Sequence, residues 1–285
     1  MPLWVLTVYC LGYYLLASVA INLAYHRVLS HRSVTLTRWF ERVAVTLGLP
    51  AGTPIQWAGN HRYHHAHTDL PGDPHSPVRD GFWFAHVGWY IQSSNPSLCF
   101  LYAVAGPVRT VVDAWHRPRS NQQFNHLAPD VSADPYYRWV SRPWPYLVCT
   151  LAHVTFFFGL TWALFGGVGV AALWATLTVI YNLGDAIDSA AHLWGQRPYA
   201  SAHHARNHWF LGIFTLGEGW HANHHEFPRS ARHGLLPGQC DWTWGMIRLL
   251  TWLGLAKDAH VPDARAVSER LVRGGHVGGA TQDSG

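Results

Sequence analysis

The chain has few charged residues: Asp, Glu, Lys and Arg make up 13% of its 285 residues, against about 25% in a typical soluble domain. It has no long basic block and a formal net charge of only +4, which argues against a nucleic-acid partner. The four cysteines are scattered and form no C-x-x-C pair, so neither a disulfide framework nor a zinc ribbon is indicated. Hydrophobic residues make up 49% of the chain, which, with the low charge, predicts a membrane protein.

Three long apolar segments are expected to cross the membrane, because each is close to the roughly 20 residues that a bilayer requires. They are residues 3–24, 144–165 and 168–186. Residues 39–57 are apolar in part but interrupted by Glu41, Arg42, Pro50 and Pro54, so this stretch is expected to be a re-entrant or surface helix. A mean hydropathy of -0.01 is modest for a membrane protein, so a sizeable part of the chain should lie in water.

The sequence therefore predicts an all-α membrane protein, with about three transmembrane helices under a helical cap in the cytosol. The cap would consist of residues 26–142 and 188–272, and residues 1–275 would form a single domain. The Gly-rich residues 274–285 are expected to be a disordered tail.

Histidine is unusually abundant, with 21 residues against 16 Asp and Glu together. The pattern H-x-x-H-H occurs twice, at His61–His65 and at His221–His225. Positions i, i+3 and i+4 share one face of a helix, so each copy is expected to present three imidazoles to one point. Imidazole is a ligand for iron, zinc and copper, and the repeated pattern predicts a metal site.

Further histidines follow the ends of the first and last apolar segments. His26 and His31 are five residues apart, about 140° round an ideal helix. They can serve one site only if the helix ends between them; otherwise they bind different ions. His192 follows the last apolar segment, with Asp188 one helical turn before it. The predicted ligands are His26, His31, His61, His64, His65, His192, His221, His224 and His225.

Nine histidines are too many for one ion, because zinc for example takes four ligands. Two ions with four or five imidazoles each would fit the number, and two nearby iron ions can activate O2 to attack an unactivated C–H bond. Glu218, Asp69 and Asp73 are candidates to hydrogen-bond ligand imidazoles, as carboxylates often do around metal sites.

The membrane topology follows if the histidines meet on one side of the bilayer. The N-terminus then lies on the opposite side, and arginines 27, 32, 38, 42, 62 and 79 lie on the histidine side. The link Gly166-Gly167 on the other side carries no charge. Since positive charge favours the cytoplasmic side, the histidines are expected to face the cytoplasm.

These motifs resemble those of the membrane fatty-acid desaturase family, in particular its stearoyl-CoA (Δ9) branch, in a bacterial-type form. The matching segments are His26–Ser33, His61–His65, Asp80–Trp89, Ser189–Gly195 and Gly217–His225. The resemblance implies an O2-dependent enzyme with two iron ions that introduces a cis double bond into a long acyl chain, held as acyl-CoA or acyl lipid. It also implies a separate electron carrier, such as ferredoxin or cytochrome b5, and a place in the cytoplasmic membrane of a bacterium. Trp83, Phe84 and Trp89 would either line the acyl tunnel or form an interfacial aromatic belt.

The chain departs from the family's animal members at several places. Asp188 stands where those enzymes have an Asn that contacts iron through water, so it is a possible ligand, directly or through water. Gly59 and Asn60 replace an Arg-Asp pair associated with the CoA headgroup. The animal enzymes have four spans where three are expected here, and the His-Pro-Gly-Gly mark of a fused cytochrome b5 module is absent.

Two other functions are compatible with the histidines. The same centre would serve a lipid hydroxylase or acetylenase, and Asp188 is the residue that motivates this alternative. A metal transporter fits less well, because transporters place their ligands within the spans near the bilayer midplane, whereas these histidines lie beyond them.

Overall fold

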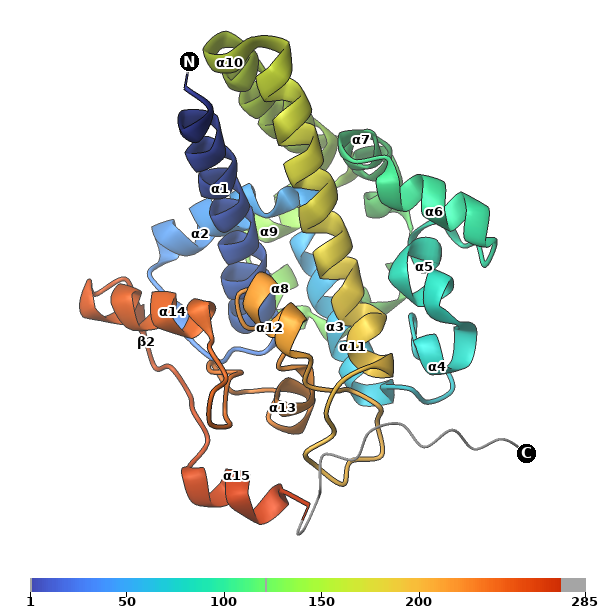
Figure 1. Ribbon diagram of the computed structural model, residues 1–285, viewed down its shortest axis with the longest axis vertical. Helices are drawn as coiled ribbons and strands as arrows, with labels where there is room; N and C mark the ends of the chain where they lie inside the picture. The colour runs from blue at the N-terminus through green and yellow to red at the C-terminus, as the bar shows by residue number, and fades with distance from the viewer. Residues whose placement is uncertain (1, 121, 273–285) are drawn as a thin grey trace.

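The computed structural model describes residues 2–120 and 122–272, so the tail predicted for residues 274–285 lies outside the described residues. The chain forms a stem of long helices above a cap of short helices and loops (Figure 1). The stem consists of α1 (Leu3–Val19), its continuation η1 (Ala20–Ser30) and α10 (Pro143–Asp188). In these described residues the only strands are β1 (Thr35–Leu36) and β2 (Ala256–Lys257), paired antiparallel in the cap.

Two helices are long and apolar enough to cross a membrane. The first, Leu3–Ser30, extends beyond the expected residues 3–24 because α1 runs without interruption into η1. The second, Pro143–Leu193, contains a reversal at Gly166, whose φ of 61° and ψ of -154° are not helical. Figure 1 shows the two limbs of α10 joined at the top of the stem, opposite the cap. The expected helical membrane fold is confirmed.

A bent pair of helices packs against the side of the stem. α6 (Pro96–Val104) and α7 (Pro107–His116), the latter extended by η4 (Arg117–Arg119), meet at an angle of 109°, as in a broken span or a re-entrant loop. The bend falls at Gly106, whose φ is 55° and whose Cα faces α10 so closely that a Cβ would lie 2.5 Å from Trp174 Nε1. A glycine is required there by both the backbone conformation and the space.

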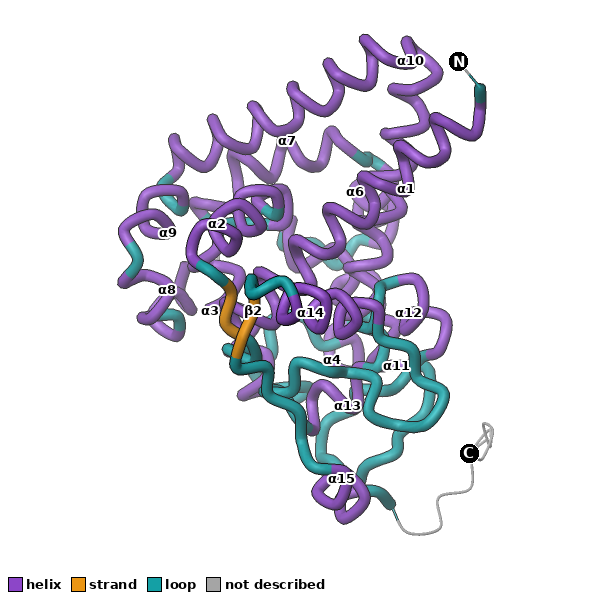
Figure 2. Tube along the Cα trace, turned by 90° about the vertical axis from the view of Figure 1, so that its left-hand side faces the viewer, coloured by secondary structure: helices purple, strands orange, loops and turns teal. Residues whose placement is uncertain are grey.

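The cap is built from short helices and connecting loops, which Figure 2 shows below the stem. Its first half contains α2 (Arg38–Leu47), η2 (Leu49–Ala51), α3 (Pro54–His67), α4 (Pro77–Asp80), η3 (Phe84–Gly88), α5 (Trp89–Ile91), η5 (Gln122–Leu127), α8 (Pro129–Ala133) and α9 (Pro135–Val140). Its second half contains α11 (Ala190–Leu193), α12 (Trp209–Phe214), α13 (His221–Glu226), α14 (Trp242–Trp252) and α15 (Ala264–Arg270). Residues 39–57 thus fall in two separate helices, α2 and α3, joined by η2.

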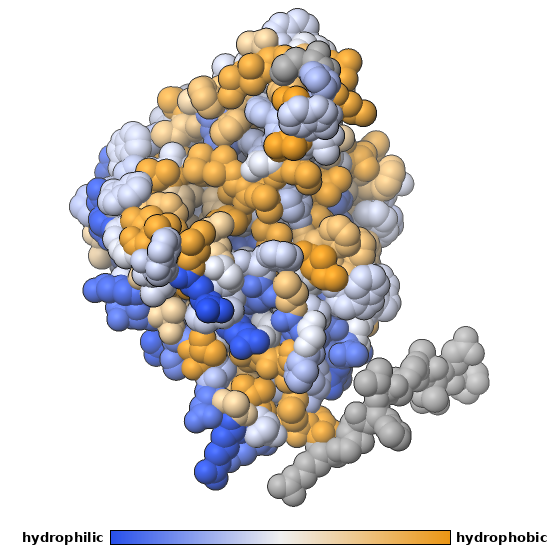
Figure 3. Space-filling model, turned by 60° about the vertical axis from the view of Figure 1, so that its left-hand side comes forward, coloured by the Kyte–Doolittle hydropathy of each residue, from blue (hydrophilic) through white to orange (hydrophobic). Residues whose placement is uncertain are grey.

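The largest hydrophobic cluster ties the end of the stem to the cap. Leu23 and Tyr25 of η1 are fully buried there with Val45 of α2, Ala58 of α3 and Ile247 of α14. Apolar residues cover the surface of the stem, whereas hydrophilic residues gather on the cap (Figure 3). This division is what a protein with its stem in a bilayer and its cap in water requires.

A pair of polar side chains joins the helices of the stem. The Tyr13 hydroxyl of α1 and His153 Nε2 of α10 lie 3.1 Å apart, an interhelical hydrogen bond of the kind expected for a histidine inside a span. All four cysteines are free thiols.

Candidate metal centre

The end of the first long helix is a π-helix, and this places His26 and His31 together. The His31 N–H donates to the His26 carbonyl at 3.1 Å, a bond between residues five apart instead of four. Such π segments are rare and occur frequently at functional sites. Of the two possibilities that the sequence left open, the structure gives the first: η1 ends at Ser30, and the two imidazole rings lie 5.0 Å apart.

The helix that carries His61, His64 and His65 begins at a capped position. Thr53 Oγ1 accepts from the Gln56 N–H at 3.3 Å, and Pro54 occupies the first turn of α3, where its missing N–H is not needed.

The two H-x-x-H-H copies do not each present three imidazoles to one point, so that expectation was wrong. His61 and His65 have their Nε2 atoms 3.1 Å apart, and the same is true of His221 and His225 at 3.0 Å. The remaining histidine of each copy joins the other pair. Residues i and i+4 differ by only about 40° round a helix, whereas i+3 lies about 100° from i+4, so one helix serves two sites.

The nine histidines divide into two groups. The five-histidine group contains His26, His31, His61, His65 and His224, and the four-histidine group contains His64, His192, His221 and His225. Within each group the possible ligand atoms all lie within 4.8 Å of one another. Eight of the nine histidines lie in η1, α3, α11 and α13, and His31 directly follows the end of η1.

The distances within the groups fit metal coordination. The Nε2 atoms of His26 and His224 lie 3.0 Å apart, those of His31 and His61 2.8 Å, and those of His192 and His221 3.0 Å. Adjacent nitrogens round an octahedral ion lie about 3 Å apart when each metal–nitrogen bond is about 2.1 Å. The donor set of neutral imidazoles suits iron, zinc or copper.

Buried carboxylates orient several of these imidazoles. Glu218 Oε2 lies 2.5 Å from His26 Nδ1, Asp73 Oδ1 lies 2.8 Å from His64 Nδ1, and Asp69 Oδ2 lies 3.1 Å from His192 Nδ1. With its Nδ1–H donated to a carboxylate, each ring has its Nε2 lone pair directed toward the group centre. Such outer partners fix the tautomer of metal-binding histidines.

The electrostatics of the centre keep Glu218 ionised and favour the neutral form of His221, His224 and His225. Burial raises the pKa of Glu218, but the Arg27 guanidinium and His26 outweigh it and hold that pKa well below the usual range. Burial, with the charges of neighbouring histidines, holds the pKa of His221, His224 and His225 well below 6.5. Neutral imidazole is the form that binds a metal.

The sequence did not assign three residues that the structure brings to the centre. Arg27 is completely buried, ion-pairs with Glu218 and lies 3.3 Å from Asp241. His233 is 1% exposed, with its Nδ1 3.4 Å from Glu218 and its ring 4.5 Å from that of His224. His75 stacks on His64 at 4.3 Å. The spacing gave no signal for the last two, because neither stands in an H-x-x-H-H copy.

Asp188 and the aromatic candidates take different places. Asp188 belongs to neither histidine group but lines both pockets beside them. Trp89 lines the smaller of these pockets, whereas Trp83 and Phe84 are not among the residues that line either one. Trp83 packs instead against the small hydrophobic cluster of Val87, Cys99 and Ala103.

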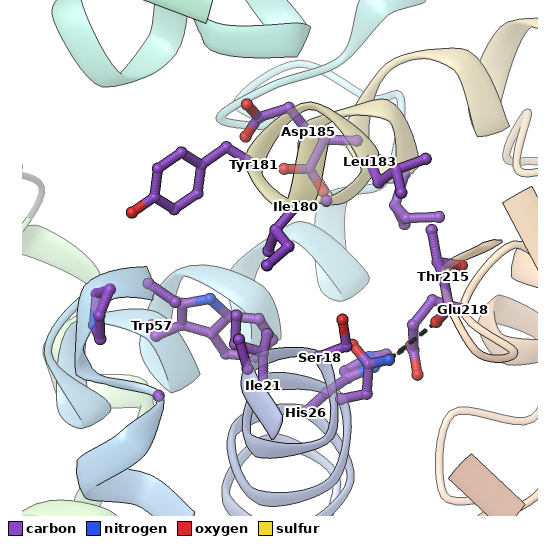
Figure 4. Close-up of a pocket in the computed structure, with 18 of the residues that line it drawn as sticks. Ser18, Ile21, His26, Trp57, Ile180, Tyr181, Leu183, Asp185, Thr215 and Glu218 are labelled. Carbon is purple, nitrogen blue, oxygen red and sulfur yellow. Dashed lines mark hydrogen bonds and ion pairs between the residues drawn. The ribbon is translucent and has the colours of Figure 1, made fainter. Parts of the chain in front are cut away.

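The larger pocket runs from the stem to the histidines, and its empty space of about 1180 Å³ includes a part that is open to solvent. Tyr13 and Ile21 line it in the stem, and His26, His61 and His221 line it at the centre. Figure 4 shows Ile180, Tyr181 and Asp185 of α10 on one side of this space, with Ser18, Ile21 and His26 on the other. Apolar and aromatic side chains thus make up much of its lining in the stem, whereas histidines line it at the centre.

Fold and site together define a helical membrane protein whose cap holds a nine-histidine centre of two groups. A family model described as "Fatty acid desaturase" matches residues 2–237. The chain belongs to the fatty acid desaturase family, and the resemblance inferred from its motifs is confirmed.

Individual relatives are about one-third identical to the chain. It is 36% identical over 246 residues to a probable chloroplastic lipid desaturase of Arabidopsis thaliana, covering 86% of this chain and 60% of the relative. It is 36% identical over 257 residues to an acyl-CoA C20 Delta5-desaturase of Anemone leveillei, and this match covers 89% of the chain and 73% of the relative. It is also 36% identical over 248 residues to an sn-2 palmitoyl-lipid 9-desaturase of Nostoc, and this match covers 86% of the chain and 78% of the relative.

Proposed function

We propose that the protein is a fatty acyl desaturase that uses O2 to introduce a cis double bond into a long acyl chain. The observation that carries the proposal is the larger pocket, which joins the apolar stem to His26, His61 and His221. A hydrocarbon chain lying in it would have one of its C–C bonds next to the histidine centre. Membership of the family and the names of the relatives support the same activity.

Two iron ions are the proposed cofactors, one in each histidine group. Bound there, they would supply the activation of O2 that removes two hydrogens from the chain. The residues of the protein orient the imidazoles, exclude bulk water from the buried centre and hold the substrate. Overall, –CH2–CH2–, O2, two electrons and two protons give –CH=CH– and two waters. The electrons come from a separate carrier, proposed to be a ferredoxin or a cytochrome b5 with its reductase.

We propose that the substrate's acyl chain is carried by a lipid in preference to CoA. Gly59 stands where animal members carry an Arg associated with the CoA headgroup. A Cβ at Gly59 would lie 2.4 Å from the Phe124 carbonyl oxygen, so η5 occupies the space that a side chain would need. Asn60, at the next position, is 7% exposed and lines the smaller pocket.

We further propose that residues 1–275 act as one domain in the cytoplasmic membrane of a bacterium, with the histidines facing the cytoplasm. The apolar stem and the hydrophilic cap support this placement. Labelling of single cysteines introduced at the Gly166 turn and in the cap of intact cells tests it. Labelling of the cap from outside would contradict it.

Aerobic expression in a host that lacks its own acyl desaturase tests the function. The expected result is a new monounsaturated acyl chain in the host lipids, mapped by mass spectrometry of derivatised double bonds. His224→Ala, which removes one member of the five-histidine group, is the matched control and should give none. No new unsaturated chain from the wild-type protein, with iron bound and an electron donor supplied, would refute the proposal.

A lipid hydroxylase or acetylenase with the same centre is the second candidate. The observation that favours it is the carboxylate of Asp188, which faces both pockets beside the histidines. The product mass separates the reactions, because desaturation removes two hydrogens whereas hydroxylation adds one oxygen.

A further inference from the structure

The larger pocket and the smaller one share part of their lining beside the histidines, and we call this shared part the neck. Six residues line both pockets and define it: Ala51, Trp57, His61, Tyr90, Arg117 and Asp188. From the neck the larger pocket extends to Tyr13 in the stem, and the smaller one extends to Gln56 and Ser120 in the cap. An acyl chain that occupies both pockets passes through the neck next to His61.

Tyr90 is held in the neck by two cations. The guanidinium carbon of Arg109 lies 4.8 Å from the centre of its ring, and that of Arg117 lies 4.4 Å away. Cation–π contacts of this kind become stronger when they are removed from bulk water. Tyr90 is therefore fixed by its ring more firmly than an aliphatic side chain in the same place would be.

The two guanidinium groups are themselves fixed by buried carboxylates. Arg109 donates to both oxygens of Asp185, at 2.5 and 3.0 Å, and Arg117 lies 3.0 Å from Asp113. The side chains of Arg109 and Asp185 are only 3% and 5% exposed. Breaking a buried ion pair is strongly destabilising because it leaves an uncompensated buried charge, so the ring of Tyr90 cannot move together with Arg109 or Arg117 without a large penalty.

An ion pair beside an apolar pocket is an unusual feature. Charges at membrane depth are rare and are functional by default, yet a hydrocarbon chain offers them nothing to bind. Figure 4 shows Asp185 and Tyr181 at the α10 edge of the larger pocket, across from Trp57 and His26. These contacts connect α5, α7 and η4 to α10. They hold the ring of Tyr90 at the neck.

We propose that Tyr90 determines specificity by setting which C–C bond of the acyl chain lies beside the histidines. The inference rests on the proposed desaturase function. A saturated chain has no polar group along its length, so only the shape of the pocket can position it. Misplacement by about 1 Å is enough to change a rate about a hundredfold, and a rigid ring at the neck prevents such sliding. Arg109 and Arg117 act through Tyr90 as positioning residues.

The test is the position of the double bond in lipids of the expression host, measured as the share of each positional isomer. The wild type should give one dominant isomer. Tyr90→Leu should raise the share of neighbouring isomers about tenfold, because the chain can slide through a wider and softer neck. Tyr90→Phe, which keeps the ring over which both guanidinium groups lie, should restore the wild-type distribution.

Tyr102→Leu is the matched control. The ring of Tyr102 also lies 4.7 Å from the guanidinium carbon of Arg109, but Tyr102 lines neither pocket. This variant removes an equivalent ring from Arg109 but keeps the contacts of both guanidinium groups with Tyr90, so it should leave the isomer distribution unchanged, whatever it does to the amount of protein.

A Tyr90→Leu protein that makes product with the single wild-type isomer would overturn the inference. If Tyr90→Leu makes no product, Ala51→Leu narrows the neck from another of its residues and must shift the isomer distribution; an unshifted distribution there would likewise overturn it. A wild-type protein that forms no double bond would refute the proposed function instead, and the inference with it.

Discussion

Glu218 is the carboxylate on which the five-histidine group most depends. One of its oxygens accepts from His26 Nδ1 at 2.5 Å, and the other ion-pairs with Arg27, which has no exposed surface. Glu218→Gln preserves the shape of the side chain, but an amide has one oxygen where the carboxylate has two. If that oxygen accepts from His26, the amide NH2 faces the Arg27 guanidinium, and two donors meet.

Two effects of known size follow. Removing the outer partner of a metal-binding histidine weakens metal binding about 10- to 100-fold. Leaving a buried guanidinium without one of its carboxylates costs about 3 kcal/mol, the lower end of the range for broken buried pairs, because Asp241 remains 3.3 Å from Arg27. We therefore expect purified Glu218→Gln protein, loaded with the proposed iron, to lose this metal faster to a chelator and to unfold at a lower temperature.

Iron content during chelator titration and thermal unfolding in detergent measure the two effects separately. Glu226→Gln is the matched control: it lies next to His225 in the chain but pairs with Arg270, which is 55% exposed. Exposed pairs contribute at most about 1 kcal/mol, so this control should retain its iron. Equal iron retention by the Glu218 and Glu226 variants would refute the assigned role of Glu218.

Three further predictions follow from the structure. Gly106→Ala should lower the unfolding temperature, because a Cβ would lie 2.5 Å from Trp174 Nε1 at a backbone φ of 55°; a positive φ in a non-glycine residue alone costs about 1–3 kcal/mol. Burial, with the charge of His75, lowers the pKa of His64 from 6.5 to about 4. Between these values the unfolded chain binds more protons, so His64 alone should cost metal-free protein about 3 kcal/mol of stability as the pH falls from about 6.5 to 4, measured by denaturant unfolding. The lowered pKa values of His221, His224 and His225 add to this loss. Asp188→Asn should still yield a double bond, with loss of two hydrogens by mass spectrometry, because Asp188 lies outside both histidine groups.

The sequence was sufficient for the features that depend on composition and simple periodicity. Long apolar segments predicted the helical stem, and the number of clustered histidines predicted two sites of four or five imidazoles each. It was also enough to name Glu218 and Asp69 as candidate partners of ligand imidazoles, since these carboxylates stand close to histidines in a chain with few charges.

What the sequence could not provide depends on backbone geometry and on tertiary contacts. No sequence pattern in residues 20–30 predicts a π-helix. Yet the backbone hydrogen bond from His31 to His26 allows two histidines that are five residues apart to serve one group. Helix geometry separates the third histidine of each copy from its pair, but that His64 joins the pair of α13 and His224 the pair of α3 depends on how the folded chain brings the two helices together. His233 enters the site only because the loop before α14 folds back over Glu218.

The way the histidine groups are assembled has a consequence for the lifetime of the protein. His26 and His224 are 198 positions apart in the chain, and each group joins the end of the stem to several segments of the cap. A bound ion is therefore a cross-link, and a link that closes a loop of this length contributes on the order of 5 kcal/mol when it is covalent. Without metal, the loops of the cap would open more often to proteases. Metal supply would then govern how long each molecule survives in the cell as well as whether it is active.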